Sequence, residues 1–514
     1  MAISQIKNLG QFGCIKDQPA QDLPPNAWSH VMNARFRDGC VERIAGDQQI
    51  FTTPTTTPLW LQAYNQMDKR FWVHAGTNKV FADDGSTRAD ITPAVAPTGT
   101  QDDRWNGGVL NGVLVANNGK DAPWSWGGSG VMIPVTNWPV AQRAKVIRPY
   151  KNYLVGLDVT KNVGTTSDRF RHMVMWSTEA EPGKLPTSYS TTDPAKNSGE
   201  LDIAEEPSLM VDMLPLGDAN IIYKENAMFA MSPSGDSFVF RFQRLPGSVG
   251  ALSQNCIANT PQGHVVLTHG DVIIHSGQGP RSIIDSRMRR WIFNQIDSEK
   301  LKRSFVAVNP AANEVLVCFP TLGSIWPNMA AVWNWATDTW GARELQNATC
   351  GCIGQVDYAS ASSWNQDNSP WDDDVTAWNQ DEYSPAQSRL LLAGAAPIIS
   401  AVGVSSTMNG TAFSTVAERI GMDFDAPDQV KTVRGMRPRI DATPGVQVQI
   451  QLGGQMDVEQ PIQWSAPITY TVGQTFQADG FASGRWIGVR YQSIGNQPFR
   501  VRSHGIDVVG AGSY

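Results

Sequence analysis

The chain has 514 residues, a net charge of −7 at pH 7 and only 17% charged residues. This length allows two or three domains with cores of their own, and the weakly acidic balance argues against a surface that grips nucleic acid through its phosphates. The 46 glycines and 32 prolines supply turns, and the 18 tryptophans suit wide pleated surfaces. Together these features favour an all-β fold.

The cysteines and the apolar segments indicate in which cellular compartment the protein folds and whether it enters a membrane. Six cysteines lack the regular spacing of a disulfide framework: Cys14, Cys40, Cys256, Cys318, Cys350 and Cys352. We interpret them as small buried residues of a reducing compartment. The N-terminal residues include no apolar segment of a secretory signal, and the most apolar stretch, 390–404, is too short to span a bilayer. We therefore expect a protein that is made in a cytoplasm, with no membrane insertion.

Residues 1–58 are expected to form an N-terminal arm and linker. Asp38 and Gly39 lie between two alternating runs and predict a tight hairpin turn. The Thr/Pro-rich tract 52–58 that follows has the composition of a linker.

The range 59–360 is expected to form a β-propeller of six to seven blades. A turn residue before an apolar run of strand length recurs, with starts 33, 41, 74, 45 and 42 residues apart, at Asn78, Asn111, Asn152, Asn226, Asp271 and Asn313. A period of about 40–45 residues is typical of blades, which bury their faces by stacking around an axis. The longest interval contains a Ser/Thr/Pro-rich excursion at 178–198, so one blade is either degenerate or carries a large loop. The clearest helix is predicted at 297–305.

The range 361–419 is expected to form a Trp/Asp-rich repeat segment and connector. Trp364, Trp371 and Trp378 recur at intervals of seven, and the surrounding Pro, Asn and Asp residues favour turns over a helix. The carboxylates of 372–374 suit Ca²⁺, but three consecutive aspartates in a turn rarely converge on one ion. We therefore favour a solvated loop, with packing of its tryptophans against a neighbouring subunit as an alternative.

The range 420–514 is expected to form a C-terminal β-sandwich. Apolar and polar residues alternate over 446–452, 468–472 and 485–491. This period of two is typical of strands that bury one face and expose the other.

Motifs of known chemistry are missing or incomplete. The stretch 277–281 is too short for a phosphate-binding loop. His264 and His269 lack the glutamate of a zinc-binding helix and lie in strand-like sequence, and Cys350 and Cys352 are too close together to chelate zinc alone. We therefore predict no catalytic, cofactor-binding or metal-binding residue and no enzyme activity.

Two further patterns have both a functional and an ordinary interpretation. The stretch Asp83–Arg88 resembles a sialidase turn, but it lacks the leading Ser and the closing Trp and occurs once, so a hairpin turn is favoured. Basic residues are concentrated in one stretch: Arg281, Arg287, Arg289, Arg290, Lys300, Lys302 and Arg303. They could contact DNA phosphates or the acidic surface of a partner, but we favour a solvated face.

Five stretches spread over most of the chain share their residue types and their order with one protein family. They are the Leu-Pro-x-Asn-Ala-Trp…Asn-Ala-Arg-Phe-Arg-Asp-Gly phrase at 23–39, Met-Trp-Ser…Pro-Gly…Leu-Pro at 175–186, Tyr-Lys-Glu at 223–225, Val-Trp-Asn at 332–334 and the Trp/Asp repeat from Trp364. In these stretches the chain resembles the tail nozzle, tail hub or packaged-DNA-stabilisation (tail tubular) proteins of short-tailed bacteriophages.

The resemblance implies a β-propeller with appended β domains, six copies of which form a ring. The ring extends the tail tube below the portal and adaptor, near the tail fibres. It retains packaged double-stranded DNA and conducts it during ejection without sequence recognition, and no catalytic residues come with the family. We therefore expect a structural virion protein of a viral tail that forms a homohexamer without a cofactor. The alternative is a receptor- or glycan-binding β-propeller of a tail fibre or baseplate; a glycan-degrading propeller enzyme is a third class.

Overall fold

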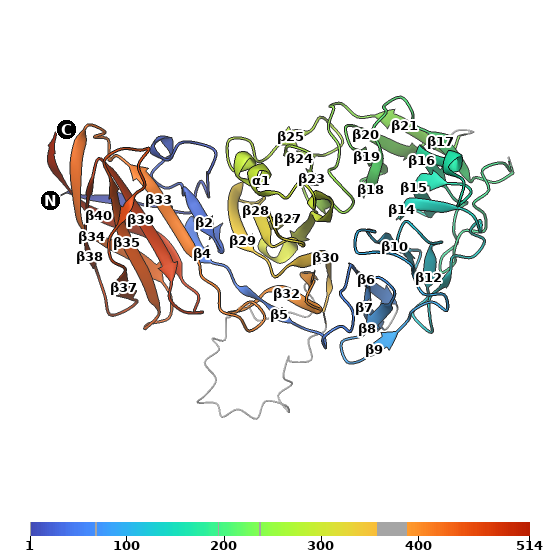
Figure 1. Ribbon diagram of the computed structural model, residues 1–514, viewed down its shortest axis with the longest axis horizontal. Helices are drawn as coiled ribbons and strands as arrows, with labels where there is room; N and C mark the ends of the chain where they lie inside the picture. Colours follow the sequence, from blue (N-terminus) through green and yellow to red (C-terminus); the bar gives the residue numbers. More distant parts are fainter. Residues whose placement is uncertain (1, 67–68, 194, 236–237, 357–387, 514) are drawn as a thin grey trace.

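The computed structural model describes residues 2–66, 69–193, 195–235, 238–356 and 388–513. Nearly every element in these ranges is a β-strand, which confirms the predicted all-β class. The strands form seven four-stranded sheets and two six-stranded sheets. In Figure 1 the seven smaller sheets lie to the right and the two larger sheets to the left.

The first four of the smaller sheets follow one another along the chain, each with its strands in sequence order. Their strands are β6 (Trp60–Gln66), β7 (Lys69–Ala75), β8 (Val80–Asp83) and β9 (Arg88–Asp90); β10 (Asn106–Leu110), β11 (Val113–Asn117), β12 (Trp124–Trp126) and β13 (Ile133–Pro134); β14 (Arg143–Tyr150), β15 (Tyr153–Thr160), β16 (Arg169–Trp176) and β17 (Gly199–Asp202); and β18 (Met210–Leu216), β19 (Ala219–Lys224), β20 (Met228–Pro233) and β21 (Phe240–Arg244).

The remaining three smaller sheets complete the series, and the last of them includes a strand from the N-terminal region. Their strands are β22 (Ile257–Thr260), β23 (Gly263–Leu267), β24 (Val272–His275) and β25 (Arg281–Ser282); β26 (Phe305–Asn309), β27 (Glu314–Phe319), β28 (Met329–Asn334) and β29 (Thr339–Glu344); and β30 (Ala348–Gln355), β31 (Ser388–Gly394), β32 (Ile398–Ser405) and β5 (Gly46–Gln49).

The first strands of the seven sheets contact one another in a circle. Each of β6, β10, β14, β18, β22, β26 and β30 contacts the next, and β30 returns to contact β6. This cyclic order, with one small antiparallel sheet per step, is the arrangement of blades in a β-propeller. Side chains from seven different sheets are therefore brought to one axis.

The seventh sheet joins residues from the two ends of the circular series. Its fourth strand, β5, pairs with β32, and a buried ion pair between Arg343 and Asp47 (2.7 Å) ties β5 to the sixth sheet. The strands of this sheet continue to Ser405, so the series extends beyond the expected range of 59–360 at both ends. The Trp/Asp repeat lies within 357–387, outside the described residues.

The repeated sequence phrase marks two different turns. Asn111, Asn152 and Asn313 precede the second strands of their sheets, whereas Asn226 precedes a third strand. The long interval between Asn152 and Asn226 therefore contains no additional sheet. It includes the connection of residues 177–198 between β16 and β17, the large loop that was one of the two expected alternatives.

The two six-stranded sheets form a sandwich built from both ends of the chain. One sheet has the order β3 (Ala34–Arg37), β4 (Cys40–Arg43), β40 (Arg500–Ser513), β34 (Gln429–Asp441) and β38 (Ala478–Gly484), with β1 (Ala2–Ile6) paired to β40. The other has the order β2 (His30–Met32), β33 (Val416–Met422), β39 (Trp486–Ser493), β35 (Gln447–Gln455) and β36 (Gln463–Trp464), with β37 (Ile468–Thr471) paired to β35.

The N-terminal residues are thus part of the sandwich, not a separate arm. Strands β1 and β4 pair with β40, β2 pairs with β33, and β3 pairs with β4. The alternating apolar residues of 30–43 thereby extend the apolar faces of the two sheets. The predicted hairpin at Asp38 and Gly39 is confirmed: both residues have positive φ (52° and 70°), as a tight primed turn requires.

Helical elements are few and short. They are α1 (Arg289–Gln295), η1 (Ala20–Asp22), η2 (Thr166–Asp168), η3 (Leu301–Arg303) and η4 (Pro310–Ala312). The helix predicted at 297–305 is wrong: the α-helix ends before it, and Phe305 already belongs to β26. The charged residues of 297–303 belong to a turn and to the short 3₁₀ helix η3, which connect α1 to β26.

The sandwich shares one continuous apolar core with two of the smaller sheets. Its buried side chains come from the sandwich and from the fifth and sixth sheets, and include Trp28, Trp333 and Trp340. Backbone bonds of the N-terminal segment reach both sides, since Cys14 donates to Trp340 O (2.8 Å) and Ser29 donates to Glu418 O (3.0 Å). The segment therefore fixes the sandwich against the sixth sheet.

Candidate functional site

The circle of inner strands encloses a small axial cavity. Residues from six of the seven sheets line its volume of about 140 Å³, among them Gln62, Arg148, Asp212, Asn255 and Cys350. This is the space of roughly five water molecules at about 30 Å³ each. The part of the axis that these described residues line therefore holds only a small cavity.

A buried ion pair crosses the cavity from the third to the fourth sheet. Arg148 donates from Nε and Nη2 to the two oxygens of Asp212, at 2.6 and 2.8 Å. Such a bidentate pair is both strong and geometrically specific. The carboxylate of Asp212 beside it raises the pKa of the Arg148 guanidinium, although burial by itself would lower that pKa.

Asn255 connects the sheets around this pair. Its side-chain oxygen accepts from Arg148 (3.0 Å), its backbone N–H donates to Asp212 (2.9 Å), and its amide contacts the carbonyl of Trp105 at 3.4 Å. Its own carbonyl accepts from Val306 (2.9 Å). The residue holds a left-handed backbone (φ 64°), which asparagine tolerates better than most residues. One side chain and its peptide groups thus link five sheets.

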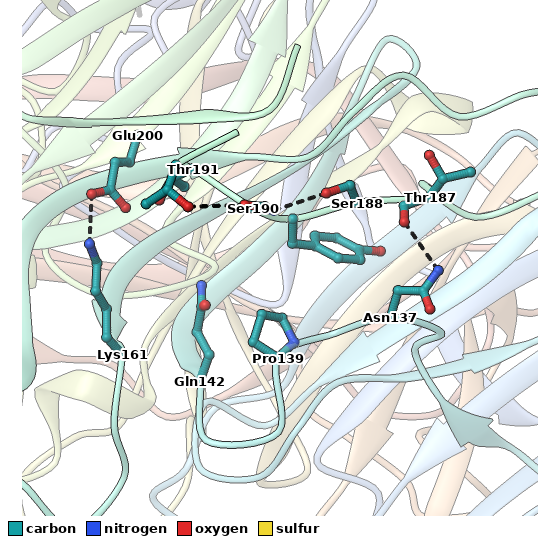
Figure 2. Close-up of a pocket in the computed structure, with 11 residues that line it drawn as sticks. Asn137, Pro139, Gln142, Lys161, Thr187, Ser188, Ser190, Thr191 and Glu200 are labelled. Atoms are coloured by element: carbon teal, nitrogen blue, oxygen red, sulfur yellow. Dashed lines mark hydrogen bonds and ion pairs between the residues drawn. The ribbon is translucent and has the colours of Figure 1, made fainter. Parts of the chain in front are cut away.

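A second, more open pocket lies on the third sheet, where the 177–198 loop covers its edge. The pocket has a volume of about 410 Å³. Figure 2 shows Lys161 facing Glu200 at one end and Asn137 near Thr187 at the other. The first two form an ion pair of 2.6 Å, and Asn137 donates to the carbonyl of Thr187 at 3.1 Å.

The lining of this pocket is dominated by hydroxyl and amide groups. They belong to Asn137, Gln142, Thr187, Ser188, Ser190, Thr191 and Thr192. Tyr189 lies beneath them, packed edge-on against Trp138 with 5.0 Å between ring centroids. Its hydroxyl is buried without a hydrogen-bond partner among the described residues, and burial raises its pKa above the ordinary value. The carboxylate of Glu200 is paired with Lys161. The pocket therefore suits binding of a ligand through hydrogen bonds better than acid–base chemistry.

Of the two histidines weighed as metal ligands, His264 lies in a buried network and His269 is exposed on a turn. Tyr223 Oη contacts His264 Nδ1 at 2.7 Å and His275 Nε2 at 2.6 Å, and His264 Nε2 contacts the carbonyl of Pro215 at 3.0 Å. Burial lowers the pKa of both imidazoles to about 4. The network therefore joins the fourth and fifth sheets with neutral histidines, and no cluster of three or more potential metal ligands occurs in the described ranges.

The other candidates from the sequence have ordinary structural positions. Cys350 and Cys352 follow each other along β30 and line the axial cavity. Asp83–Arg88 is the turn between paired strands β8 and β9, as favoured. Within the basic set, Arg303 is buried and pairs with Asp102 at 2.6 Å. Arg287 and Arg289 pair with Asp338 (3.9 Å) and Asp285 (3.6 Å). The remaining members lie on β25, α1, η3 and the turn before η3.

Apart from Cys350 and Cys352, which were weighed as zinc ligands, the residues that line the two cavities were not singled out from the sequence. Arg148, Asp212 and Asn255 are far apart in the chain and belong to no motif, so only the closing of the circle brings them together. The pocket on the third sheet has a weak signal, the Ser/Thr-rich excursion itself. No helix within the described residues is long and apolar enough to cross a membrane.

Comparisons with known proteins leave the family open. No protein-family model and no curated protein matches the chain. Solved structures that match include the computationally designed protein Ika8, with a TM-score of 0.38 and 9% identity over 73% of this chain and 96% of the other. Another is the extracellular domain of a hybrid two-component system from B. thetaiotaomicron, with a TM-score of 0.40 and 13% identity over 70% of this chain and 40% of the other. Both TM-scores are below 0.5, so no argument rests on them.

Proposed function

We propose that the protein is a structural virion component that forms a ring of copies at the tip of a phage tail. The ring retains packaged DNA and extends the path for its ejection, and the chain has no catalytic role. The resemblance of five sequence stretches to tail nozzle and hub proteins suggests this function. The observation that carries it is the outer surface of the sandwich.

That surface combines exposed aromatic and basic side chains. Phe476 and Phe481 are 84% and 68% exposed. On the neighbouring strand β34, Arg434, Arg437 and Arg439 are exposed and make no ion pair within the described residues. Exposed aromatic residues beside arginines are the composition of protein interfaces. The sandwich thus offers a contact surface for another copy or for an adaptor protein.

The size of the axial cavity limits where DNA would pass under this proposal. The major groove of duplex DNA alone is about 12 Å wide, whereas the cavity holds about 140 Å³ and contains the Arg148–Asp212 pair. DNA therefore cannot follow the axis of one propeller. In the proposed ring the passage lies between copies, which agrees with several subunits around a common axis.

Electron microscopy of the chain in purified particles tests the ring directly. We expect six copies around an open axial channel at the tail tip. The double variant of Phe476→Ser and Phe481→Ser should reduce incorporation at least about tenfold if these residues anchor the contact. Phe238→Ser, which changes a 76% exposed residue between β20 and β21, should not. Three peripheral copies, or incorporation unaffected by the double variant, would contradict the proposal.

A second candidate function is glycan binding, and the pocket on the third sheet favours it. Its hydroxyl and amide groups suit the hydroxyls of a sugar, and its volume of about 410 Å³ is within the usual range for small ligands. Saturation-transfer NMR with neutral mono- and disaccharides tests this function. Glu200→Ala should abolish the signal, because it removes the carboxylate that pairs with Lys161 in the pocket. Glu181→Ala, which changes an exposed ion pair with Lys184 on the 177–198 loop, should preserve it. No signal with the unmodified protein would exclude this candidate.

A further inference from the structure

The floor of the pocket on the third sheet differs chemically from its walls. The walls carry hydroxyl and amide groups, and the Lys161–Glu200 pair (2.6 Å) lies at one end of them (Figure 2). Among the lining residues Tyr189 alone is buried, at 2% exposed, whereas the others are half-buried or exposed. Its ring packs edge-on against Trp138 at 5.0 Å, and Pro139 lines the pocket beside it. Tyr189 and Pro139 therefore form a floor that is apolar except for one hydroxyl.

The hydroxyl of Tyr189 has no partner on this floor. Its Oη is buried and makes no hydrogen bond within the described residues. Burial raises the pKa of Tyr189 above its ordinary value, so the hydroxyl keeps its proton at neutral pH and remains a donor. A buried donor without a partner is unfavourable, because it has given up water without a new bond in exchange. The floor thus lacks one hydrogen-bond acceptor.

The walls, in contrast, hold acceptors that no group in the described part of the chain uses. Asn137 donates from Nδ2 to the carbonyl of Thr187 (3.1 Å), which leaves its Oδ1 available. Glu200 binds Lys161 through Oε1, which leaves its Oε2 available. The charges of this pair cancel, and no other lining residue is charged. The pocket therefore favours an uncharged ligand that presents N–H and O–H donors to the walls and one acceptor to the floor.

We propose that this pocket binds an N-acetylated amino sugar, with the acetamido group on the floor formed by Tyr189 and Pro139. The acetamido carbonyl accepts from the Tyr189 hydroxyl, its methyl group packs against the ring and Pro139, and its N–H faces Asn137 Oδ1. A sugar hydroxyl in the same place supplies an acceptor but no apolar group, so it fits this floor less well. The inference rests on the glycan-binding candidate above and specifies the class of its ligand.

NMR titration of the full chain with two pairs of sugars is the primary test. The pairs are N-acetylglucosamine with glucose and N-acetylgalactosamine with galactose. We expect the acetylated member of at least one pair to bind at least about tenfold more tightly than the plain hexose. In saturation-transfer spectra of that sugar the acetyl methyl protons should give the strongest signal, because they lie against the floor.

Tyr189→Phe tests the role of the hydroxyl, since it removes that group and keeps the ring. The variant should bind the acetylated sugar about tenfold more weakly and the plain hexose as before. Its melting temperature should be equal or higher, because the lost group has no partner in the fold. Tyr153→Phe is the matched control: the hydroxyl of Tyr153, on the same sheet, donates to Glu179, so this variant should melt at a lower temperature but preserve sugar binding.

The outcomes separate this inference from the glycan-binding candidate itself. Equal affinity for acetylated and plain sugars, or an acetyl preference that Tyr189→Phe retains, would overturn the inference and leave the candidate function standing. No signal with any of the four sugars would exclude both. A clear fall in the melting temperature of Tyr189→Phe would indicate that its hydroxyl is bonded within the fold, and would also overturn the inference.

Discussion

Acidification should destabilise the fold through the buried histidine network of Tyr223, His264 and His275. His264 Nε2–H donates to the carbonyl of Pro215, so its Nδ1 accepts from the Tyr223 hydroxyl. The tyrosine oxygen then accepts from His275 Nε2–H, and His275 Nδ1 faces the N–H of Gly277 at 3.4 Å. Every donor has an acceptor only while both imidazoles are neutral. Protonation of either one leaves a buried N–H or O–H without a partner.

The magnitude follows from the two pKa values. Each imidazole has a pKa of about 4 in the fold, against an ordinary value of 6.5. Because the folded pKa is lowered, the unfolded chain binds more protons between these values, so stability is complete above pH 6.5 and is lost as the pH falls toward 4. At pH 5 each histidine removes about 2 kcal/mol, and the pair about 4 kcal/mol, of a total typically about 5–15 kcal/mol.

Urea unfolding followed by tryptophan fluorescence at pH 7.5, 6 and 5 measures this loss. His275→Gln keeps a donor for Tyr223 but does not titrate, so it should reduce the pH slope by about 1.4 kcal/mol per pH unit. The exposed His269→Gln is the control and should leave the curve unchanged. His504, whose pKa burial also lowers to about 4, adds a slope of the same sign in all variants. Stability that is flat between pH 7.5 and 5, or a slope unaffected by His275→Gln, would refute the argument.

Three further substitutions test the packing that closes the fold. Asp47→Asn should destabilise the protein by about 3–5 kcal/mol, because it leaves Arg343 buried without its counter-charge; an unchanged melting temperature would contradict this role. Asn255→Ala should remove at least about 2 kcal/mol, measured by urea unfolding, as its side-chain bonds at the axis are lost. Gly454→Ala should be destabilising by about 1–3 kcal/mol, since the new Cβ would lie 2.2 Å from the carbonyl of Ser483, whereas Gly270→Ala, with open space around it, should change stability by less than about 0.5 kcal/mol. Equal effects of the two glycine variants would count against the close approach.

Local patterns in the sequence were sufficient for individual strands and turns. The Asp38-Gly39 pair predicts its hairpin because a primed turn needs positive φ at both positions, a property of the residues themselves. The alternation in 446–452 predicts a half-buried strand for the same reason: Val448, Ile450 and Leu452 are buried, whereas the glutamines between them are only partly covered. The recurring turn-and-strand phrase likewise predicted a series of small sheets.

The pairing of distant segments was not accessible in this way. The strand at Gly46–Gln49 has no pattern that distinguishes a linker from the last strand of the seventh sheet, because its partner β32 is more than 300 residues away. The same limitation explains why residues 1–58 were expected to form an arm and linker. A charged run such as 297–303 is also ambiguous, since helical surfaces and polar turns share that composition.

The amino-acid sequence by itself determined the all-β class, the tight turns and the lack of a contiguous catalytic motif, because these depend on neighbouring residues. The tertiary structure decided which sheets meet, and with them the Arg148–Asp212 pair and the hydrogen bonds that Asn255 makes around it. These features depend on the distances and burial of side chains from different sheets. They exist only once the circle of sheets has closed, and this is the physical reason why no local pattern predicts them.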